Sequence, residues 1–440
     1  MANFHPPTGV EEGLAMPACA LHNGPPCRGS HRANYGKGGR MIKKIGIGDL
    51  RPGMFVHDLN CGHIYHPLLQ TRFKLNDAGD IDRLIERGVS AVYIDTALGI
   101  DAPNAPTADE VRRDIDDALL KMARHSTAPD MVNPPPPETD IRYAHHVYEE
   151  ASLTVRELMG TARLGRHAAL EQVQPAVQDV IESIFRNSAP LLQLGTIRDA
   201  NQYLFYHSVA TCSLLGAFSR QLGIGRDITR QIAVGAMLHD IGKTRVPEAI
   251  LDKPGRLTED EFEEMKRHVE YGMEMLADTS WLTPVSLQVV SQHHERYDGT
   301  GYPHGLKGDQ ISEFGQMAAI VDVYDAITSK RTYHAAMEPV EAIRKLREWS
   351  EQHFNVELVE HFICCIGIYP VGTLVRLESG LLGEVTTHNP ADLLRPVVRV
   401  VYDGKRRCRI TPHELDLSAQ SADRIVGYES AAQWGITPAQ

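Results

Sequence analysis

Seven histidine and aspartate side chains occur between residues 207 and 322 at intervals that suit a metal centre. They are His207, His239, Asp240, His268, His293, His294 and Asp322. A donor set rich in imidazole nitrogen and poor in oxygen favours Fe, Mn, Co or Zn over Mg or Ca. Five imidazoles and two carboxylates are enough for two divalent ions with room left for water, and one carboxylate can bridge them. The sequence therefore predicts a two-metal site.

The segments that carry these residues are predicted to be helices, which give a site rigid positions. One segment begins with a capping box at Thr258, and another has Thr283 as its N-cap. Gly242 is predicted to end the helix that carries the His–Asp pair. Small residues leave one face of another helix open around Asp322 and Asp325. Any one of these residues alone is better explained as a core or chance residue, so the prediction depends on the ordered set.

The composition is that of an ordinary globular protein, because 42% of the 440 residues are hydrophobic and 23% are charged. The net charge of -12 argues against a broad nucleic-acid or anionic-membrane surface. No apolar run approaches the roughly 18 residues of a spanning helix, and the start of the chain shows no signal-peptide pattern. Seven scattered cysteines suit reduced thiols, so we expect a cytoplasmic protein without a nucleic-acid or membrane partner.

The chain divides into segments of different composition. Residues 1–40 show no periodicity, and we expect them to be disordered or, if Met41 rather than Met1 is the true start, untranslated. The further segments are predicted to be a small α+β module at 41–125, a Pro-rich linker at 126–140, a helical connector at 141–195, a helical catalytic domain at 196–366 and a small β module with its tail at 367–440. The predicted fold is therefore mainly α.

Five motifs resemble those of a known family. They are His207, HDIGK (239–243), HVEYG (268–272), HHERYDGTGYPHGLKG (293–308) and VDVYDAITSKRTYH (321–334). Together they look like the HD-GYP domain, a subgroup of the HD phosphohydrolase superfamily that hydrolyses cyclic di-GMP in bacteria. The resemblance covers about 196–366, and the flanks look like the small N-terminal domain and C-terminal tail that often accompany it. It implies an all-helical HD-type catalytic domain.

The resemblance also implies a ligand set for two divalent ions. One ion would be held by His207, His239 and Asp322, the other by His268, His293 and His294, with Asp240 bridging the two. Iron is the favoured metal and manganese the alternative. Some members bind a third ion through a Glu one turn before the first His, but Tyr203 occupies that position here. We therefore expect two ions.

The resemblance implies substrate contacts on both sides of the site. Lys243 is expected to reach a phosphate or leaving oxygen, and with Asp240 it is expected to be catalytic. Arg331 matches the phosphate-binding Arg of the family. His334 stands where members usually have Arg or Lys, and a largely neutral His would grip phosphate more weakly and in a pH-dependent way. The alternative for His334 is an exposed helix end without a role.

The loop after the paired histidines is expected to contact the substrate through Gly301, Tyr302 and Pro303. Gly299 and Gly301 allow positive φ and a close approach of the backbone to a ligand or partner. The resemblance implies that this loop also contacts diguanylate cyclase (GGDEF) domains. A homodimer is compatible with the same resemblance.

The implied function is metal-dependent hydrolysis of cyclic di-GMP to pGpG, and to GMP after a second cleavage. Two alternatives stay open. One is an HD hydrolase that acts on another cyclic dinucleotide or nucleotide, which the loop disfavours because generic HD hydrolases lack it. The other is a non-catalytic scaffold that binds a cyclic dinucleotide or a GGDEF protein, which the complete ligand set disfavours.

Overall fold

The structure is a computed structural model, and it describes most of the chain. The described residues are 41–60, 72–125, 137–165, 170–195, 203–329, 336–350, 352–419 and 423–436. Two predicted substrate contacts, Arg331 and His334, lie outside them, as does the predicted leader at 1–40.

The first described part is a small α+β module. Its strands and helices are β1 (Ile42–Gly46), β2 (Phe55–Asp58), β3 (Phe73–Lys74), α1 (Ala78–Glu86), β4 (Ala91–Asp95) and, after the sheet, α2 (Ala108–His125). The antiparallel sheet has the strand order β1-β4-β2-β3. Helix α1 begins where the Asp77 side chain accepts a hydrogen bond from the Asp80 backbone N–H. Val56, Val92 and Ile94 are fully buried in the core of the module.

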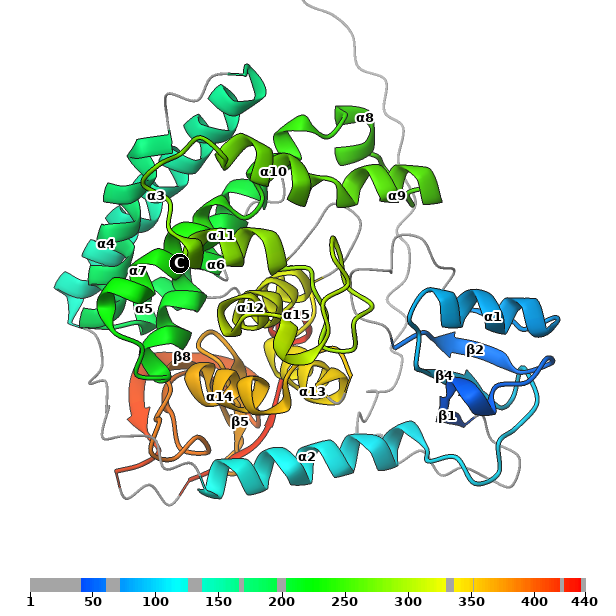
Figure 1. The fold of residues 1–440 in the computed structure, drawn as a ribbon. Helices are drawn as coiled ribbons and strands as arrows, with labels where there is room; N and C mark the ends of the chain where they lie inside the picture. The colour runs from blue at the N-terminus through cyan, green and yellow to red at the C-terminus, as the bar shows by residue number, and fades with distance from the viewer. Residues whose placement is uncertain are drawn as a thin grey trace, which may run out of the picture. The chain divides into compact units, whose positions relative to one another are not determined.

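The central part of the chain is helical. Its helices are α3 (Glu138–Arg163), α4 (Val173–Arg186), α5 (Ala189–Leu194), α6 (Tyr203–Gln221), α7 (Arg226–Leu238), α8 (Glu248–Leu251), α9 (Glu259–Lys266), α10 (His268–Leu276), α11 (Pro284–Gln292), α12 (Glu313–Thr328), α13 (Pro339–Trp349) and α14 (Val356–Ile366). Helices α6, α7, α11 and α12 pack together within it (Figure 1). One hydrophobic cluster runs through these helices and also through α3, α4, α5, α13 and α14. The helices of residues 141–195, predicted as a connector, thus share the core of the site-bearing helices.

The C-terminal part is an antiparallel sheet with the strand order β8-β7-β6-β5-β9. Its elements are β5 (Leu374–Leu377), β6 (Leu381–Thr387), β7 (Val397–Asp403), β8 (Cys408–Asp416), β9 (Ile425–Tyr428) and the short helix α15 (Ala431–Trp434). Val375, Val385, Val398 and Val400 are fully buried on one face of the sheet. The prediction of a mainly α fold with small strand-containing parts at both ends is confirmed.

The local helix signals were correct at two starts and wrong at two other points. The capping box at Thr258 and the N-cap at Thr283 are both present. The segment after Thr258 forms two helices, α9 and α10, that meet at Arg267, whereas we predicted one helix. Gly242 does not end α7, which stops at Leu238; it lies in the 3-10 segment Ile241–Arg245.

Close packing, not helix termination, explains the glycine at position 242. A Cβ there would lie 1.9 Å from the backbone oxygen of His268 and 2.4 Å from the backbone nitrogen of Gly272. The first turn of α10 therefore passes directly against the chain just after the His–Asp pair. This contact brings two of the motifs together.

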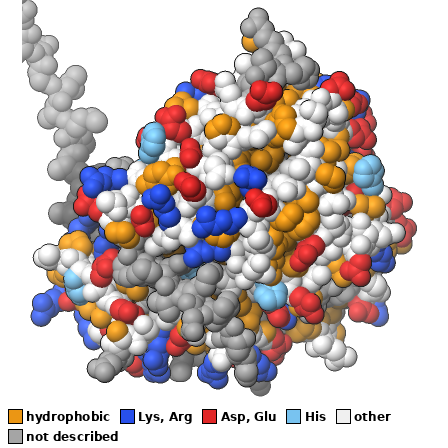
Figure 2. Space-filling view, turned by 60° about the vertical axis from the view of Figure 1, so that its left-hand side comes forward, with side chains coloured by type: hydrophobic (Ala, Val, Ile, Leu, Met, Phe, Trp, Pro, Cys, Tyr) orange, Lys and Arg blue, Asp and Glu red, His pale blue; other side chains and the backbone are white. Residues whose placement is uncertain are grey.

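The surface carries both charge signs. Acidic and basic side chains are interspersed over the face drawn in Figure 2, with a small group of Lys and Arg side chains near its middle. That face therefore presents no wide area of a single charge. Within the described part of the chain, no helix combines the length and the apolar character needed to cross a membrane.

Candidate metal centre

The seven predicted ligands converge from five helices, mostly from helix ends. His207 lies inside α6 and Asp322 inside α12, whereas the others lie at or beside the ends of α7, α10 and α11. Six of the seven side chains belong to buried residues, and the His294 side chain is only 11% exposed. The structure thus brings all seven together. The ends of α7 and α11 carry their ligands as we predicted, whereas His268, predicted inside a longer helix, is the first residue of α10.

The first group of donors contains His207, His239 and Asp322. The Nε2 atoms of His207 and His239 lie 3.2 Å apart. Oδ1 of Asp322 lies 3.0 Å from Nε2 of His207 and 3.9 Å from Nε2 of His239. Two imidazole nitrogens and one carboxylate oxygen therefore face one point.

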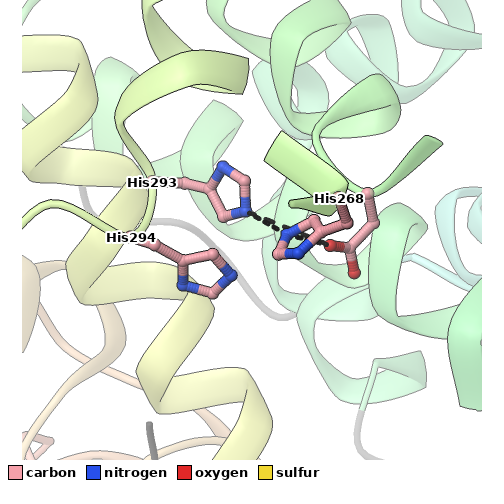
Figure 3. Close-up of side chains that lie close together, drawn as sticks. His268, His293 and His294 are labelled. Atoms are coloured by element: carbon pink, nitrogen blue, oxygen red, sulfur yellow. Dashed lines mark hydrogen bonds and ion pairs between the residues drawn. The ribbon is translucent and has the colours of Figure 1, made fainter. Parts of the chain in front are cut away.

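The second group contains His268, His293 and His294, which approach one another in Figure 3. The Nε2 atoms of His268 and His293 lie 3.4 Å apart. The rings of the adjacent His293 and His294 have centroids 4.1 Å apart and are tilted by 45°. Adjacent residues at the end of α11 thus offer two nitrogens to the same small volume.

Asp240 lies between the two groups and turns one oxygen toward each. Its Oδ2 atom is 3.6 Å from Nε2 of His207 and 3.4 Å from Nε2 of His239. Its Oδ1 atom is 3.5 Å from Nε2 of His268 and 4.0 Å from Nε2 of His293. This geometry is the one a bridging carboxylate requires.

Hydrogen bonds on the far side of three imidazoles set their orientation. Nδ1 of His239, His268 and His293 lies 2.7–2.8 Å from the backbone carbonyl oxygen three residues earlier. A carbonyl oxygen only accepts, so Nδ1 must carry the proton in each ring. In the neutral ring Nε2 then has a free lone pair, and this nitrogen points to the centre.

Burial keeps most of these imidazoles neutral. It lowers the pKa of His268 to about 4 and that of His293 to about 3, and it holds the pKa of His294 well below its ordinary value. Burial also opposes the charge on His207 and so lowers its pKa, but hydrogen bonds to Asp322 and Asp325 outweigh this effect and raise the pKa above its ordinary value. At neutral pH three rings can therefore donate lone pairs without first losing a proton.

The two carboxylates are ionised despite their burial. Burial opposes the charge on Asp240, but the nearby His239 and Lys243 hold its pKa well below the usual range. Burial likewise opposes the charge on Asp322, and its hydrogen bond with His207 holds its pKa well below the usual range. The centre thus combines anionic oxygen donors with neutral nitrogen donors.

Two features show that this donor set fits divalent metal ions. Oδ1 of Asp240 and Nδ1 of His294 are buried and have no hydrogen-bond partner, which is costly unless a cation satisfies them. The unprotonated Nε2 atoms of His268 and His293 face each other at 3.4 Å, where their lone pairs repel unless a cation is shared. Either group can hold one ion, and Asp240 directs one oxygen to each group.

The predicted substrate residues that the structure describes lie beside the centre. Nζ of Lys243 donates to Oδ2 of Asp240 at 2.6 Å. The ring of Tyr302 stacks on His294 with centroids 4.6 Å apart, and Pro303 follows it in the same loop. The loop therefore contacts a predicted metal ligand directly.

Only one of the two loop glycines has the backbone conformation that we expected. Gly299 has φ +84°, as predicted. Gly301 does not have positive φ, and a Cβ there would lie 2.3 Å from the backbone nitrogen of Arg296 and 2.5 Å from Cα of Glu295. The close approach at Gly301 is thus to the backbone of its own loop.

Two residues that contribute to the site had no role assigned from the sequence. Oδ2 of Asp325 lies 2.6 Å from Nδ1 of His207, and both residues are buried. The spacing of Asp322 and Asp325, three residues apart on one helix, was the available signal. The second residue is Glu295, a buried carboxylate inside the loop, for which no sequence signal was available.

These features indicate a class of protein. Two groups of His and Asp donors that share one carboxylate within a helical domain are the arrangement expected of a two-metal hydrolase. Comparison with known proteins agrees with this class: residues 192–358 match the HD domain family, and residues 42–173 match a family described as a domain of unknown function.

Similarity to other proteins extends over nearly the whole chain. A cyclic di-GMP phosphodiesterase of Pseudomonas aeruginosa is 38% identical over 402 residues, which is 90% of this chain and 94% of that protein. A cyclic di-GMP phosphodiesterase response regulator of Xanthomonas campestris is 37% identical over 173 residues, 39% of this chain and 45% of that protein. A 3'3'-cGAMP-specific phosphodiesterase of Vibrio cholerae is 38% identical over 139 residues, 31% of this chain and 27% of that protein. The chain belongs to the HD-GYP family of phosphodiesterases.

Proposed function

We propose that the chain hydrolyses cyclic di-GMP to pGpG and then to GMP, which lowers the level of this bacterial second messenger. The observation that carries the proposal is the convergence of seven donors into two groups that share Asp240. The Pseudomonas relative, which matches 90% of the chain, is named as an enzyme of this activity.

The residues of the centre have distinct roles in this reaction. Ions held by the two groups would supply an activated water molecule and positive charge for the phosphate. Asp240 sets the spacing of the two groups, because its oxygens face different histidines. Lys243 can hydrogen-bond a phosphate oxygen or donate a proton to the leaving ribose O3' as the P–O3' bond breaks. Tyr302 borders the second group and is placed to contact the substrate.

Several finer points belong to the same proposal. Iron is the proposed metal and manganese the alternative, since five imidazoles and two carboxylates suit these ions. Arg331 and His334 stay proposed phosphate contacts on the family resemblance alone. Three other points are proposed on the same resemblance. They are a GGDEF protein as a partner of the loop at residues 299–303, a homodimer, and a cytoplasmic location.

A second candidate substrate is 3'3'-cGAMP. The observation that favours it is the Vibrio relative, which is named as specific for that dinucleotide and is 38% identical over 139 residues. The two cyclic dinucleotides differ in one base, so the metal centre alone does not separate them.

One assay decides among these candidates and the scaffold. Full-length protein is prepared anaerobically, loaded with Fe(II) or Mn(II), and incubated in parallel with cyclic di-GMP and 3'3'-cGAMP, and the products are separated by chromatography. We expect pGpG or GMP from cyclic di-GMP, and no product from the double variant His239→Ala, Asp240→Ala. Turnover of 3'3'-cGAMP alone would support the second candidate. No turnover by fully metal-loaded protein would support a scaffold.

A further inference from the structure

A cyclic dinucleotide carries two phosphates, and the metal centre takes one of them at a time. The other phosphate keeps its negative charge throughout the reaction. Binding the substrate therefore benefits from a second cationic contact near, but outside, the metal centre.

Lys266 lies in a suitable place for this contact. It is the last residue of α9, two positions before His268. Its Nζ atom lies 5.8 Å from the centroid of the Tyr302 ring, within the range of a cation–π contact. The same ring stacks on His294 with the planes 29° apart. One aromatic ring thus separates the ammonium group from a predicted metal ligand.

The charge of Lys266 is available to a ligand. Its ion pair with Glu263, at 2.6 Å, involves side chains that are 25% and 67% exposed. Exposed ion pairs contribute little and are screened by salt, so a phosphate can replace Glu263. Lys243 differs, because its partner Asp240 is fully buried and belongs to the centre itself.

The Tyr302 ring is held in place by the loop. Glu295 is only 2% exposed, and its carboxylate accepts hydrogen bonds from the backbone N–H groups of His304 at 2.8 Å and Leu306 at 2.9 Å. The Tyr302 backbone N–H donates to the His294 carbonyl oxygen at 3.1 Å. The surface on which Lys266 rests is therefore a fixed part of the site.

We propose that Lys266 binds the phosphate of the cyclic dinucleotide that is not being cleaved, while the two histidine groups take the other. This inference rests on the proposed function. A lysine ammonium is a compact, hydrated point charge with rotatable donors, which suits a phosphate oxygen near solvent. Lys266 then determines substrate affinity and not the rate of bond cleavage.

The test uses two variants at this position and a matched control, all in the full-length chain. Lys266→Met keeps the apolar stem and removes the charge, whereas Lys266→Arg keeps a charge. Lys253→Met is the control, because it removes a lysine that pairs with Glu261 near the other end of α9. The substrates are cyclic di-GMP and bis(p-nitrophenyl) phosphate, a diester with a single phosphate.

We expect Lys266→Met to raise KM for cyclic di-GMP about tenfold, the effect of losing one charge-assisted hydrogen bond. Its kcat, its metal content and its hydrolysis of bis(p-nitrophenyl) phosphate should stay within about twofold of wild type, since removal of uniform binding changes KM alone. Lys266→Arg should restore most of the affinity, and Lys253→Met should change nothing. Equal losses on both substrates, or a loss of metal, would show a structural role and overturn the inference.

Calorimetry of cyclic di-GMP binding to the metal-free protein separates this inference from the proposed function. Here too Lys266→Met should raise the dissociation constant for cyclic di-GMP about tenfold relative to wild type. If the metal-loaded wild type binds cyclic di-GMP without cleaving it, the proposed function fails and the affinity ratio still tests Lys266. An unchanged ratio, or no binding by the wild type, counts against Lys266.

Discussion

The substitution Asp325→Asn tests whether a residue outside the ligand set controls the metal. The Asp325 carboxylate lies 2.6 Å from Nδ1 of His207, and the two side chains are 2% and 1% exposed. The oxygen of Asn can still accept this hydrogen bond, so the ring should stay in place. The substitution removes the negative charge that helps to raise the pKa of His207. The same charge makes the ring nitrogen a stronger electron-pair donor to a metal ion.

The expected effect is confined to one ion. Loss of such a partner costs about 10- to 100-fold in metal affinity, or about 1.4–2.8 kcal/mol. Because His207 belongs to the first group, only one of the two ions should bind more weakly. Activity should be low at limiting metal and should recover as the metal concentration is raised.

Competition with a chelator under anaerobic conditions measures this affinity directly. Asp227→Asn is the matched control, because the Asp227 side chain is 87% exposed and pairs with Arg230 on its own helix. Asp325→Asn protein that keeps both ions with wild-type affinity would refute the argument that this carboxylate acts through His207.

Three further predictions follow from the packing and the buried groups. Gly242→Ala places a Cβ 1.9 Å from the His268 backbone oxygen. Thermal unfolding should show that the free energy of unfolding falls by about 1–3 kcal/mol, and metal analysis should show less bound metal. In metal-free protein, burial lowers the pKa of His268 and His388 to about 4. The unfolded chain therefore binds more protons than the folded chain below about pH 6.5. The free energy of unfolding, measured by urea titration, should fall by about 2 kcal/mol for each of these residues as the pH is lowered to about 5. A free energy of unfolding that does not change with pH would contradict this. Glu295→Gln should speed hydrogen exchange at the two loop amides that it holds, and unchanged protection there would show that the clamp is unimportant.

The sequence was most informative about the identity of the ligands and least informative about their setting. Spacing and residue type were enough to select seven residues that lie together in the structure. The same pattern placed His239 and His293 near helix ends, and they are the C-caps of α7 and α11. At those positions Nδ1 can reach the carbonyl oxygen three residues earlier, a contact that residue spacing alone does not reveal.

Apart from the ligand set, contacts between distant segments could not be predicted from the sequence. Gly242 looked like a helix terminator because its role depends on α10, which passes against it from 26 residues further along the chain. The helices at 141–195 looked like a connector because a periodic apolar face does not say which partner it packs against. Asp325 was visible only as a neighbour of Asp322, since its bond to His207 joins two helices.

The most direct test of the account is the metal content of the full-length chain, prepared without oxygen and measured together with cyclic di-GMP turnover. The geometry predicts about two divalent ions per chain in active protein, one for each donor group, and loss of both metal and turnover in the double variant His239→Ala, Asp240→Ala. Full turnover by protein that holds no metal, or by the double variant, would contradict the account.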